Sequence, residues 1–139
     1  MADAKDTSMT LKALLVEDNE NNRYLLRLLL EQAGFTVVTA EEGKLGIAMA
    51  REEHPDVILL DIQMPEMDGY EVATVLKSDP ALRRIPIVGV SSFAMPGDRE
   101  KAIRSGFAGY IEKPVDPERF ADSVKTFLRN VAPDANSQR

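Results

Sequence analysis

Five short apolar runs recur along the chain, and a segment with helical periodicity separates each run from the next. The runs cover residues Lys12–Val16, Phe35–Thr39, Asp56–Leu60, Pro86–Val90 and Ala108–Ile111. The runs that end at Val16 and Leu60 are apolar without alternation, which is typical of strands buried on both faces. Strands that alternate with helices favour a parallel sheet with right-handed crossovers and helices on both of its faces. The sequence therefore predicts an α/β fold with five strands and five helices.

Local signals set the expected boundaries of the helices. The expected helices are Glu20–Ala33, Gly43–Glu53, a third from Asp68–Gly69 to about Ser78, a fourth over Pro96–Ser105, and a fifth that starts at Asp116–Pro117. Gly34 directly follows the first helix, where glycine commonly ends a helix. Asp68 and Glu71 have the spacing of a capping box. Asp116 followed by Pro117 is typical of an N-cap and a first helical residue.

Composition limits the class of protein. The chain has 139 residues, which fits one domain, and we expect residues 11–131 to form it between flexible tails at 1–10 and 132–139. A net charge of −6 argues against non-specific binding to nucleic acid. The absence of cysteine excludes disulfides and thiolate chemistry. No apolar run reaches membrane-spanning length, and the N-terminus lacks a signal-peptide pattern, so we expect a cytoplasmic protein without a membrane partner.

Carboxylates follow two of the apolar runs at the point where each run ends. Glu17 and Asp18 follow the first run, and Asp61 follows the third. The carboxyl edge of an open α/β sheet is where ligands bind, so neighbouring strands would bring the three acids together. Such a cluster needs a cation, a proton or water, and Mg²⁺ prefers oxygen ligands of this kind. The alternative is that each acid only caps a helix or faces water, which explains one of them better than all three.

Two further runs end in polar groups that suit a phosphoryl group. Ser91 follows the fourth run, and Lys113 follows the fifth shortly after its last apolar residue. A hydroxyl and an ammonium group beside a carboxylate–metal centre supply the hydrogen bond and the positive charge that phosphoryl oxygens need. Taken alone, Ser91 reads as a turn residue and Lys113 as a solvent-exposed one. Their position at the ends of strands in one sheet favours the functional reading.

Four separated motifs then occur in the order found in response-regulator receiver domains of two-component signalling. They are LVEDN at Leu15–Asn19, LDIQMPEMDG at Leu60–Gly69, VSS at Val90–Ser92 and KP at Lys113–Pro114. The chain resembles that family over almost its whole length, from about Leu11 to Arg129. The resemblance implies a flavodoxin-like, doubly wound parallel sheet with strand order 2-1-3-4-5.

The resemblance also implies a role for each acid. Asp61 corresponds to the phosphoacceptor, a carboxylate nucleophile that forms an aspartyl phosphate. Glu17 and Asp18 correspond to the acidic pair that holds Mg²⁺, with Asp18 the direct ligand. Asp61 itself and the backbone carbonyl of Gln63 complete the expected set of protein ligands, and the carbonyl's role does not depend on the glutamine side chain.

Three more residues receive roles from the same resemblance. Lys113 would pair with Asp61 and afterwards with the phosphoryl oxygens, and its peptide bond to Pro114 is expected to be cis. Ser91 stands where threonine is commoner in the family and would hydrogen-bond the phosphoryl group after a loop shift. Tyr110 corresponds to the aromatic residue whose rotamer follows that shift.

The implied function is that of a single-domain response regulator. A histidine kinase or a phosphotransfer protein would donate the phosphoryl group to Asp61, and the modified chain would bind a downstream protein through its fourth helix, fifth strand and fifth helix. Such a chain catalyses its own phosphorylation and slow dephosphorylation but is not an enzyme that turns over a separate substrate. No output segment follows Arg129, although the chain also fits a receiver module excised from a hybrid histidine kinase.

Three other readings fit the sequence less well. An aspartate-nucleophile phosphatase of the haloacid-dehalogenase type needs a second aspartate two residues after the nucleophile, where this chain has Gln63. It also needs room for a cap domain. A flavin-binding module needs a phosphate loop rich in glycine and hydroxyl groups, where this chain has Glu17-Asp18-Asn19. A receiver that has lost its chemistry would not be expected to keep the full set of acids, serine and lysine.

Overall fold

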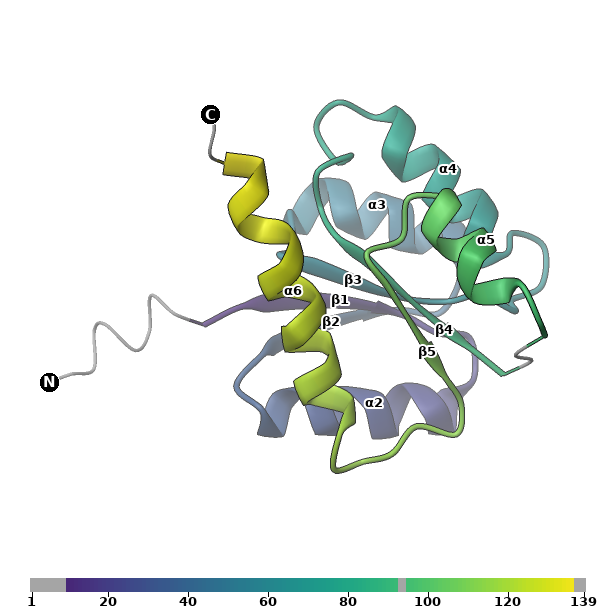
Figure 1. The fold of residues 1–139 in the computed structure, drawn as a ribbon. Helices are drawn as coiled ribbons and strands as arrows, with labels where there is room; N and C mark the ends of the chain where they lie inside the picture. The colour runs from purple at the N-terminus through teal and green to yellow at the C-terminus, as the bar shows by residue number, and fades with distance from the viewer. Residues whose placement is uncertain (1–9, 93–94, 137–139) are drawn as a thin grey trace, which may run out of the picture.

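The computed structural model describes residues 10–92 and 95–136, which form a five-stranded parallel sheet between two layers of helices (Figure 1). The strands are β1 (Lys12–Val16), β2 (Thr36–Ala40), β3 (Val57–Asp61), β4 (Ile87–Ser91) and β5 (Gly109–Glu112). The helices are α2 (Glu20–Gln32), α3 (Gly43–Glu53), α4 (Gly69–Ser78), α5 (Asp98–Arg104) and α6 (Phe120–Asn136). The strand order is β2-β1-β3-β4-β5, so the predicted fold class and topology are confirmed.

The register of the strands determines which residues meet at the carboxyl edge of the sheet. Val16 of β1 pairs with Leu60 of β3, so the residues that follow these two strands lie side by side. On the other side, Asp61 pairs with Val90 of β4. All neighbouring strands are parallel, and the chain passes to opposite sides of β1 when it enters β2 and β3. In open α/β sheets, ligands bind beyond the strand ends at such a reversal, which here lies between β1 and β3.

Two hydrophobic cores lie on the two faces of the sheet. Residues Leu14 and Val16 of β1 pack with α3, α4 and α5, whereas Ala13 and Leu15 pack with α2 and α6. Successive side chains of a strand point to opposite faces, so a strand buried on both faces must be apolar throughout. The two layers explain why the run that forms β1 shows no polar alternation.

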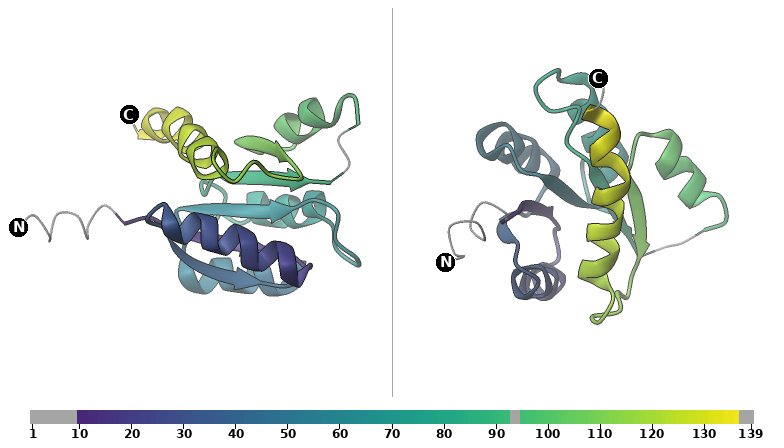
Figure 2. Two further views of the ribbon diagram at one scale, coloured as in Figure 1. Left: turned by 90° about the horizontal axis from the view of Figure 1, so that it is seen from below. Right: turned by 60° about the vertical axis from the view of Figure 1, so that its left-hand side comes forward.

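Helices α2 and α6 lie next to each other on one face of the sheet (Figure 2). Lys125 Nζ on α6 donates to the carbonyl of Ala33 at the end of α2, at 3.0 Å. The remaining helices cover the opposite face, where buried side chains of α3, α4 and α5 contact one core. Among the described residues, no helix combines the length and the apolar character that crossing a bilayer requires.

Several boundaries differ from the sequence-based expectation. Strands β2 to β5 each begin and end one residue later than expected, which places Asp61 and Ser91 within strands rather than after them. The cause is pairing between strands, because Ile62 N donates to Val90 O at 3.0 Å and Lys113 N donates to Ser91 O at 2.8 Å. These bonds continue the ladder beyond the apolar run that the sequence reveals.

The last two helices also differ from the prediction. Helix α5 spans Asp98–Arg104 and is shorter than expected at both ends. Helix α6 begins at Phe120, because Asp116 instead forms a preceding turn in which its side chain accepts from Glu118 N and its carbonyl accepts from Phe120 N. Helix α6 continues to Asn136, so the boundary expected after residue 131 lies inside it. Residues 1–9 and 137–139 of the expected tails lie outside the described residues.

The loop after β3 returns to the sheet through a tight contact at Gly69. Asp68 Oδ1 accepts from Glu71 N and Glu71 Oε1 accepts from Asp68 N, both at 2.9 Å, so the predicted capping box is confirmed. Gly69 N donates to Ile62 O at 2.9 Å. A Cβ atom at Gly69 would lie 2.8 Å from both Asp61 O and Ile62 Cα, which are backbone atoms that cannot turn away.

Replacing Gly69 by alanine is therefore expected to lower the free energy of unfolding by about 1–3 kcal/mol, as overpacking does in a tight site. Urea unfolding measures the change. Gly34→Ala serves as the comparison, since a Cβ there meets no atom within 4 Å and only the positive φ of +100° opposes it. A loss for Gly69→Ala no larger than that for Gly34→Ala would contradict the packing argument.

Candidate functional site

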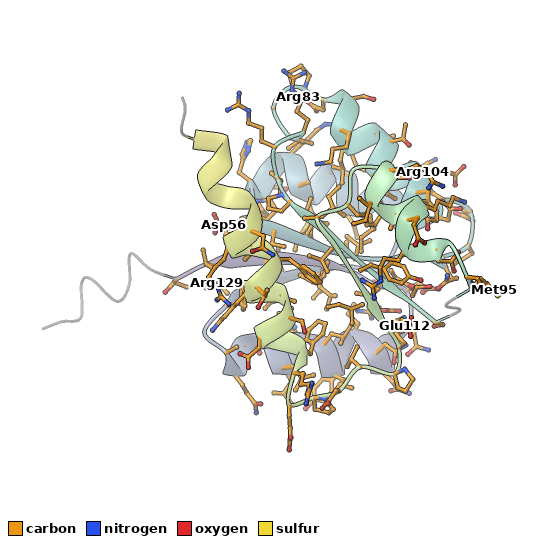
Figure 3. The ribbon with its side chains drawn as sticks, viewed as in Figure 1. Asp56, Arg83, Met95, Arg104, Glu112 and Arg129 are labelled. Carbon is orange, nitrogen blue, oxygen red and sulfur yellow. The ribbon has the colours of Figure 1, made fainter. Side chains whose placement is uncertain are left out.

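Side chains from the ends of four strands converge at the carboxyl edge of the sheet. Figure 3 labels one residue near each end of the sheet: Asp56 directly precedes β3, and Glu112 is the last residue of β5. The site lies at the Glu112 end, just beyond the last residues of β1, β3, β4 and β5. The side chains that the structure brings together there are those of Glu17, Asp18, Asp61, Ser91 and Lys113.

The three acids form one cluster, as the sequence predicted for neighbouring strands. One carboxylate oxygen from each of Glu17, Asp18 and Asp61 lies within 4.8 Å of the others. Glu17 and Asp61 are buried, with 1% and 3% of their surface exposed, whereas Asp18 is exposed. Three oxygen donors at this spacing, with one of them open to solvent, suit a small hard cation.

Lys113 reaches into the cluster from the end of β5. Its Nζ lies 2.8 Å from Glu17 Oε1 and 3.5 Å from Asp61 Oδ1. The expected pairing with Asp61 is therefore present, but the shorter contact is with Glu17, which the sequence did not indicate. The Lys113–Pro114 peptide is cis, as expected. One ammonium group thus serves two buried carboxylates, and a third carboxylate lies beside them.

The charge balance of the cluster affects the protonation of Asp61. The pKa of Asp61 is raised from 3.8 to about 7, first by burial and then by the negative charge of Glu17. The positive charge of Lys113 lowers this pKa, and hydrogen bonds with Asp18 and Glu17 raise it. Without a cation, the site therefore holds more negative charge than Lys113 balances, and Asp61 binds a proton near neutral pH.

Glu17 is held in place by the start of α2. Asn19 N donates to Glu17 Oε2 at 3.1 Å, and Arg23 Nη1 donates to the Glu17 carbonyl at 2.9 Å. Asn19 is also the N-cap of α2, where its side chain accepts from Asn22 N at 2.9 Å. The acidic pair therefore lies on a rigid junction between β1 and α2.

Gln63 contributes more to the site than the sequence indicated. Its backbone N donates to Asp61 Oδ1 at 3.2 Å. Its side-chain Nε2 donates to Ser91 Oγ and its Oε1 accepts from Ser92 N, both at 2.8 Å. The sequence did not indicate these side-chain bonds, since nothing in the local pattern reveals a contact 28 residues along the chain.

Tyr110 lies in β5 rather than in the acid cluster. The side chain is buried, and its hydroxyl has no hydrogen-bond partner among the residues that the structure describes. The guanidinium carbon of Arg99, on α5, lies 5.5 Å from the centre of the Tyr110 ring, within the range of a cation–π contact. Tyr110 thus joins the core to α5.

Comparison with known proteins gives one consistent family. The family model described as the response regulator receiver domain matches residues 13–125. The polar-differentiation response regulator DivK of Brucella ovis is 44% identical over 120 residues, covering 86% of this chain and 98% of that protein. DivK of Brucella anthropi is 42% identical over the same length, with the same coverage.

Solved structures agree with the sequence relatives. The chemotaxis protein CheY4 of Vibrio cholerae superposes with a TM-score of 0.80 at 27% identity, over 85% of this chain and 98% of that chain. The signal receiver domain of a signal transduction histidine kinase from Syntrophus aciditrophicus gives a TM-score of 0.77 at 31% identity. That match covers 88% of this chain and 92% of the other.

The raised pKa of Asp61 predicts a pH-dependent effect of Asp61→Asn on stability in the presence of a chelator. A folded-state pKa of about 7, above the unfolded value of 3.8, means that protonated Asp61 favours the folded state. This contribution is complete below about pH 4 and is lost as pH rises through about 7. The free energy of unfolding of Asp61→Asn, relative to that of the wild type, should therefore be roughly 2–4 kcal/mol higher at about pH 8 than at about pH 4.

Denaturant unfolding at both pH values measures this change. Glu52→Gln, which replaces a carboxylate on the exposed surface of α3 outside the acid cluster, is the control for a change of charge alone. A difference between Asp61→Asn and wild type that is the same at both pH values would contradict the raised pKa of Asp61 in the folded state.

Proposed function

The chain belongs to the response regulator receiver domain family, and we propose that it is a phosphorylation-operated switch whose acceptor is Asp61. The observation that carries this proposal is the environment of Asp61, a buried strand-end carboxylate that shares Lys113 with Glu17 and lies beside Asp18. Acceptance of a phosphoryl group is general in the family. The specific donor, the metal and the residue roles below are our proposal.

In the proposed reaction, a carboxylate oxygen of Asp61 attacks the phosphorus of a phosphohistidine on a histidine kinase or phosphotransfer protein. The new O–P bond forms as the P–N bond breaks, and the imidazole nitrogen leaves with the bonding electrons. Lys113 Nζ, 3.5 Å from Asp61 Oδ1, can pair with the phosphoryl oxygens that arrive beside it. The group is then held by charge and hydrogen bonds rather than by further covalent chemistry.

The acid cluster fits a divalent cation. Its oxygens are hard donors within 4.8 Å of one another, and one ammonium group, that of Lys113, lies among the three carboxylates. Asp18, the exposed member, and Asp61 would be direct ligands together with the Gln63 carbonyl, while Glu17 also pairs with Lys113. Mg²⁺ bound there would supply positive charge to the phosphoryl oxygens.

The proposed signal leaves the site through Ser91 and Tyr110. The Ser91 hydroxyl would donate to a phosphoryl oxygen on Asp61, and the main chain after β4 would shift with it. Because Tyr110 is a buried residue of β5 whose ring contacts Arg99 of α5, that shift would change the face made by α5, β5 and α6. A downstream protein would bind this face, so the switch acts by shifting a conformational equilibrium. The proposed partners are cytoplasmic proteins, and neither nucleic acid nor a membrane has a part.

The phosphatase alternative is less well supported. The side chain two residues after Asp61 belongs to Gln63, an amide that cannot act as a general acid and that is already bonded to Ser91 and Ser92. The chain is similar both to DivK regulators and to the receiver domain of a histidine kinase. The proposed chemistry at Asp61 is the same whether the receiver acts alone or within a hybrid kinase.

Phosphorylation of Asp61 predicts a simple mass change. Incubation with acetyl phosphate and Mg²⁺ should add the mass of one phosphoryl group to the wild-type protein, measured on the intact chain. Asp61→Asn, which keeps the shape of the side chain but lacks the nucleophilic oxygen, should remain unmodified. An unmodified wild type, or equal modification of Asp61→Asn, would contradict the proposed function.

Binding of Mg²⁺ through Asp18 predicts a change in thermal stability. Mg²⁺ should raise the Tm of the wild type, because a ligand that binds only the folded state stabilises it. Asp18→Asn should weaken Mg²⁺ binding by about tenfold or more, equivalent to about 1.4 kcal/mol, as loss of a charged ligand requires.

Glu41→Gln is the matched control for that measurement. Glu41 is an exposed acid beside the same hollow as Asp18 but is not part of the three-acid cluster. Mg²⁺ should raise the Tm of Glu41→Gln by as much as it raises that of the wild type. Equal losses in the two variants would show that Mg²⁺ is attracted by surface charge in general and not by the cluster.

A further inference from the structure

Arg23 holds the turn between β1 and α2 from within the helix. Its backbone N donates to Asn19 O at 2.9 Å, which is the first hydrogen bond along the main chain of α2. Its side-chain Nη1 donates to the carbonyl of Glu17, also at 2.9 Å. One residue is thus bonded to two carbonyls of the turn that carries the acidic pair.

The Glu17 carbonyl belongs to the peptide group that joins Glu17 to Asp18. A peptide group is planar from one Cα atom to the next, so a bond to its oxygen also restrains the Cα atom of Asp18. The peptides on either side are bonded as well, because Glu17 N donates to Ala40 O at 3.0 Å and Asn19 N donates to Glu17 Oε2 at 3.1 Å. The bond from Arg23 holds the peptide between them.

Asp18 is the acid of the cluster that depends most on the main chain for its placement. Its side chain is exposed, whereas those of Glu17 and Asp61 are buried. An exposed carboxylate has few packed neighbours to hold it, so its direction follows the backbone from which it extends. Mg²⁺ requires nearly ideal geometry, and a site binds it tightly only when the ligands are already held in place. A small turn of the peptide before Asp18 would therefore weaken the site.

The charge of Arg23 does not explain its position. It is the fourth residue of α2, near the end of the helix where the helix dipole disfavours a cation. Among the residues whose side chains the structure describes, its guanidinium forms no ion pair with a carboxylate. A cation close to a metal site also repels the metal. The hydrogen bond to Glu17 is the interaction that favours an arginine here.

We propose that Arg23 is a positioning residue for the metal, which holds the Glu17 carbonyl, directs the Asp18 carboxylate toward the acid cluster and thereby raises the affinity for Mg²⁺. The inference rests on the proposed function, in which Asp18 is a direct ligand. Loss of a group that orients a metal ligand through a hydrogen bond typically lowers metal affinity by roughly 10–100-fold. Because Arg23 acts on the backbone of the ligand, we expect the lower end of that range, about tenfold.

Positioning and charge predict opposite results when the guanidinium is removed. Loss of a positive charge near the site would tighten Mg²⁺ binding, because less repulsion then opposes the metal. Loss of the hydrogen bond would weaken Mg²⁺ binding, because the peptide before Asp18 is then free to turn. A residue that only stabilised the fold would lower the Tm and leave the Mg²⁺ affinity of the folded protein unchanged.

The test replaces Arg23 by methionine, which keeps an unbranched apolar stem but has neither the charge nor the donor. NMR follows the amide signals of Asp18 and Asp61 while the full-length protein is titrated with Mg²⁺, at a temperature at which every variant is folded. The Kd for Mg²⁺ should rise by about tenfold in Arg23→Met. Arg23→Lys keeps a charged donor on a slightly shorter chain, so its Kd should lie between those of the wild type and Arg23→Met.

Two further variants complete the test. Arg23→Gln is too short to reach the Glu17 carbonyl, so its Kd should rise as that of Arg23→Met does, and it replaces Arg23→Met if that variant does not fold. Arg27→Met is the matched control, because it removes the same charge one turn further along α2, where Arg27 Nε is bonded to Glu31 Oε2 at 3.0 Å on the exposed surface. Its Kd should stay within about twofold of the wild-type value, since solvent screens an exposed charge.

Other outcomes would overturn the inference. A Kd of Arg23→Met equal to or below that of the wild type would do so, even if its Tm falls. An equal rise in Arg27→Met, or a Kd of Arg23→Lys as high as that of Arg23→Met, would also contradict it. If the wild type binds no Mg²⁺, the metal site of the proposed function fails and this inference fails with it. If the wild type binds Mg²⁺ and Arg23→Met binds it equally well, only this inference fails.

Discussion

The contact of Lys113 with two buried carboxylates is the interaction on which the site depends. Glu17 and Asp61 are almost fully removed from solvent, and like charges at such positions cannot both ionise without a counter-charge. Lys113 Nζ lies close to both, although Lys113 and Glu17 are 96 positions apart in the chain. One ammonium group balances only part of this charge, which leaves the edge of the sheet receptive to a cation and to a phosphoryl group.

The strand order makes that contact possible. Glu17 follows β1 and Asp61 is the last residue of the neighbouring strand β3, whereas Lys113 follows the edge strand β5 and reaches them past β4. Strand β4, which lies between β3 and β5, ends in Ser91, a residue with a small side chain. Because the sheet is parallel, all four strand ends face the same way, and three helices on one side with two on the other keep these ends rigid.

The same arrangement supports the proposed switch. Asp61 is held by charge on one side and by the backbone of Gln63 on the other, while the Gln63 side chain reaches the end of β4. A change at Asp61 therefore alters both the electrostatic balance and a hydrogen-bonded link to the neighbouring strand. Tyr110 and Arg99 continue the connection from β5 to α5. A small chemical change can thus bias the packing of one side of the molecule.

The sequence by itself determined what depends on residues close together in the chain. Apolar runs and helical periodicity gave the α/β class, Asp68 and Glu71 gave the start of α4, and the ends of the runs indicated where the acids would gather. The strand order came from the family resemblance and not from any local pattern. Strand ends were expected one residue early because Asp61 and Ser91 are polar, and only pairing with neighbouring strands extends the ladder to include them.

Only the tertiary structure decided which polar groups bond to which. The short contact of Lys113 with Glu17, and the two bonds from the Gln63 side chain to Ser91 and Ser92, join residues on different strands. Their distances depend on register, rotamers and the packing of both helical layers, none of which a local pattern records. The sequence specified the chemical groups at the edge of the sheet, and the fold determined how charge and hydrogen bonds are shared among them.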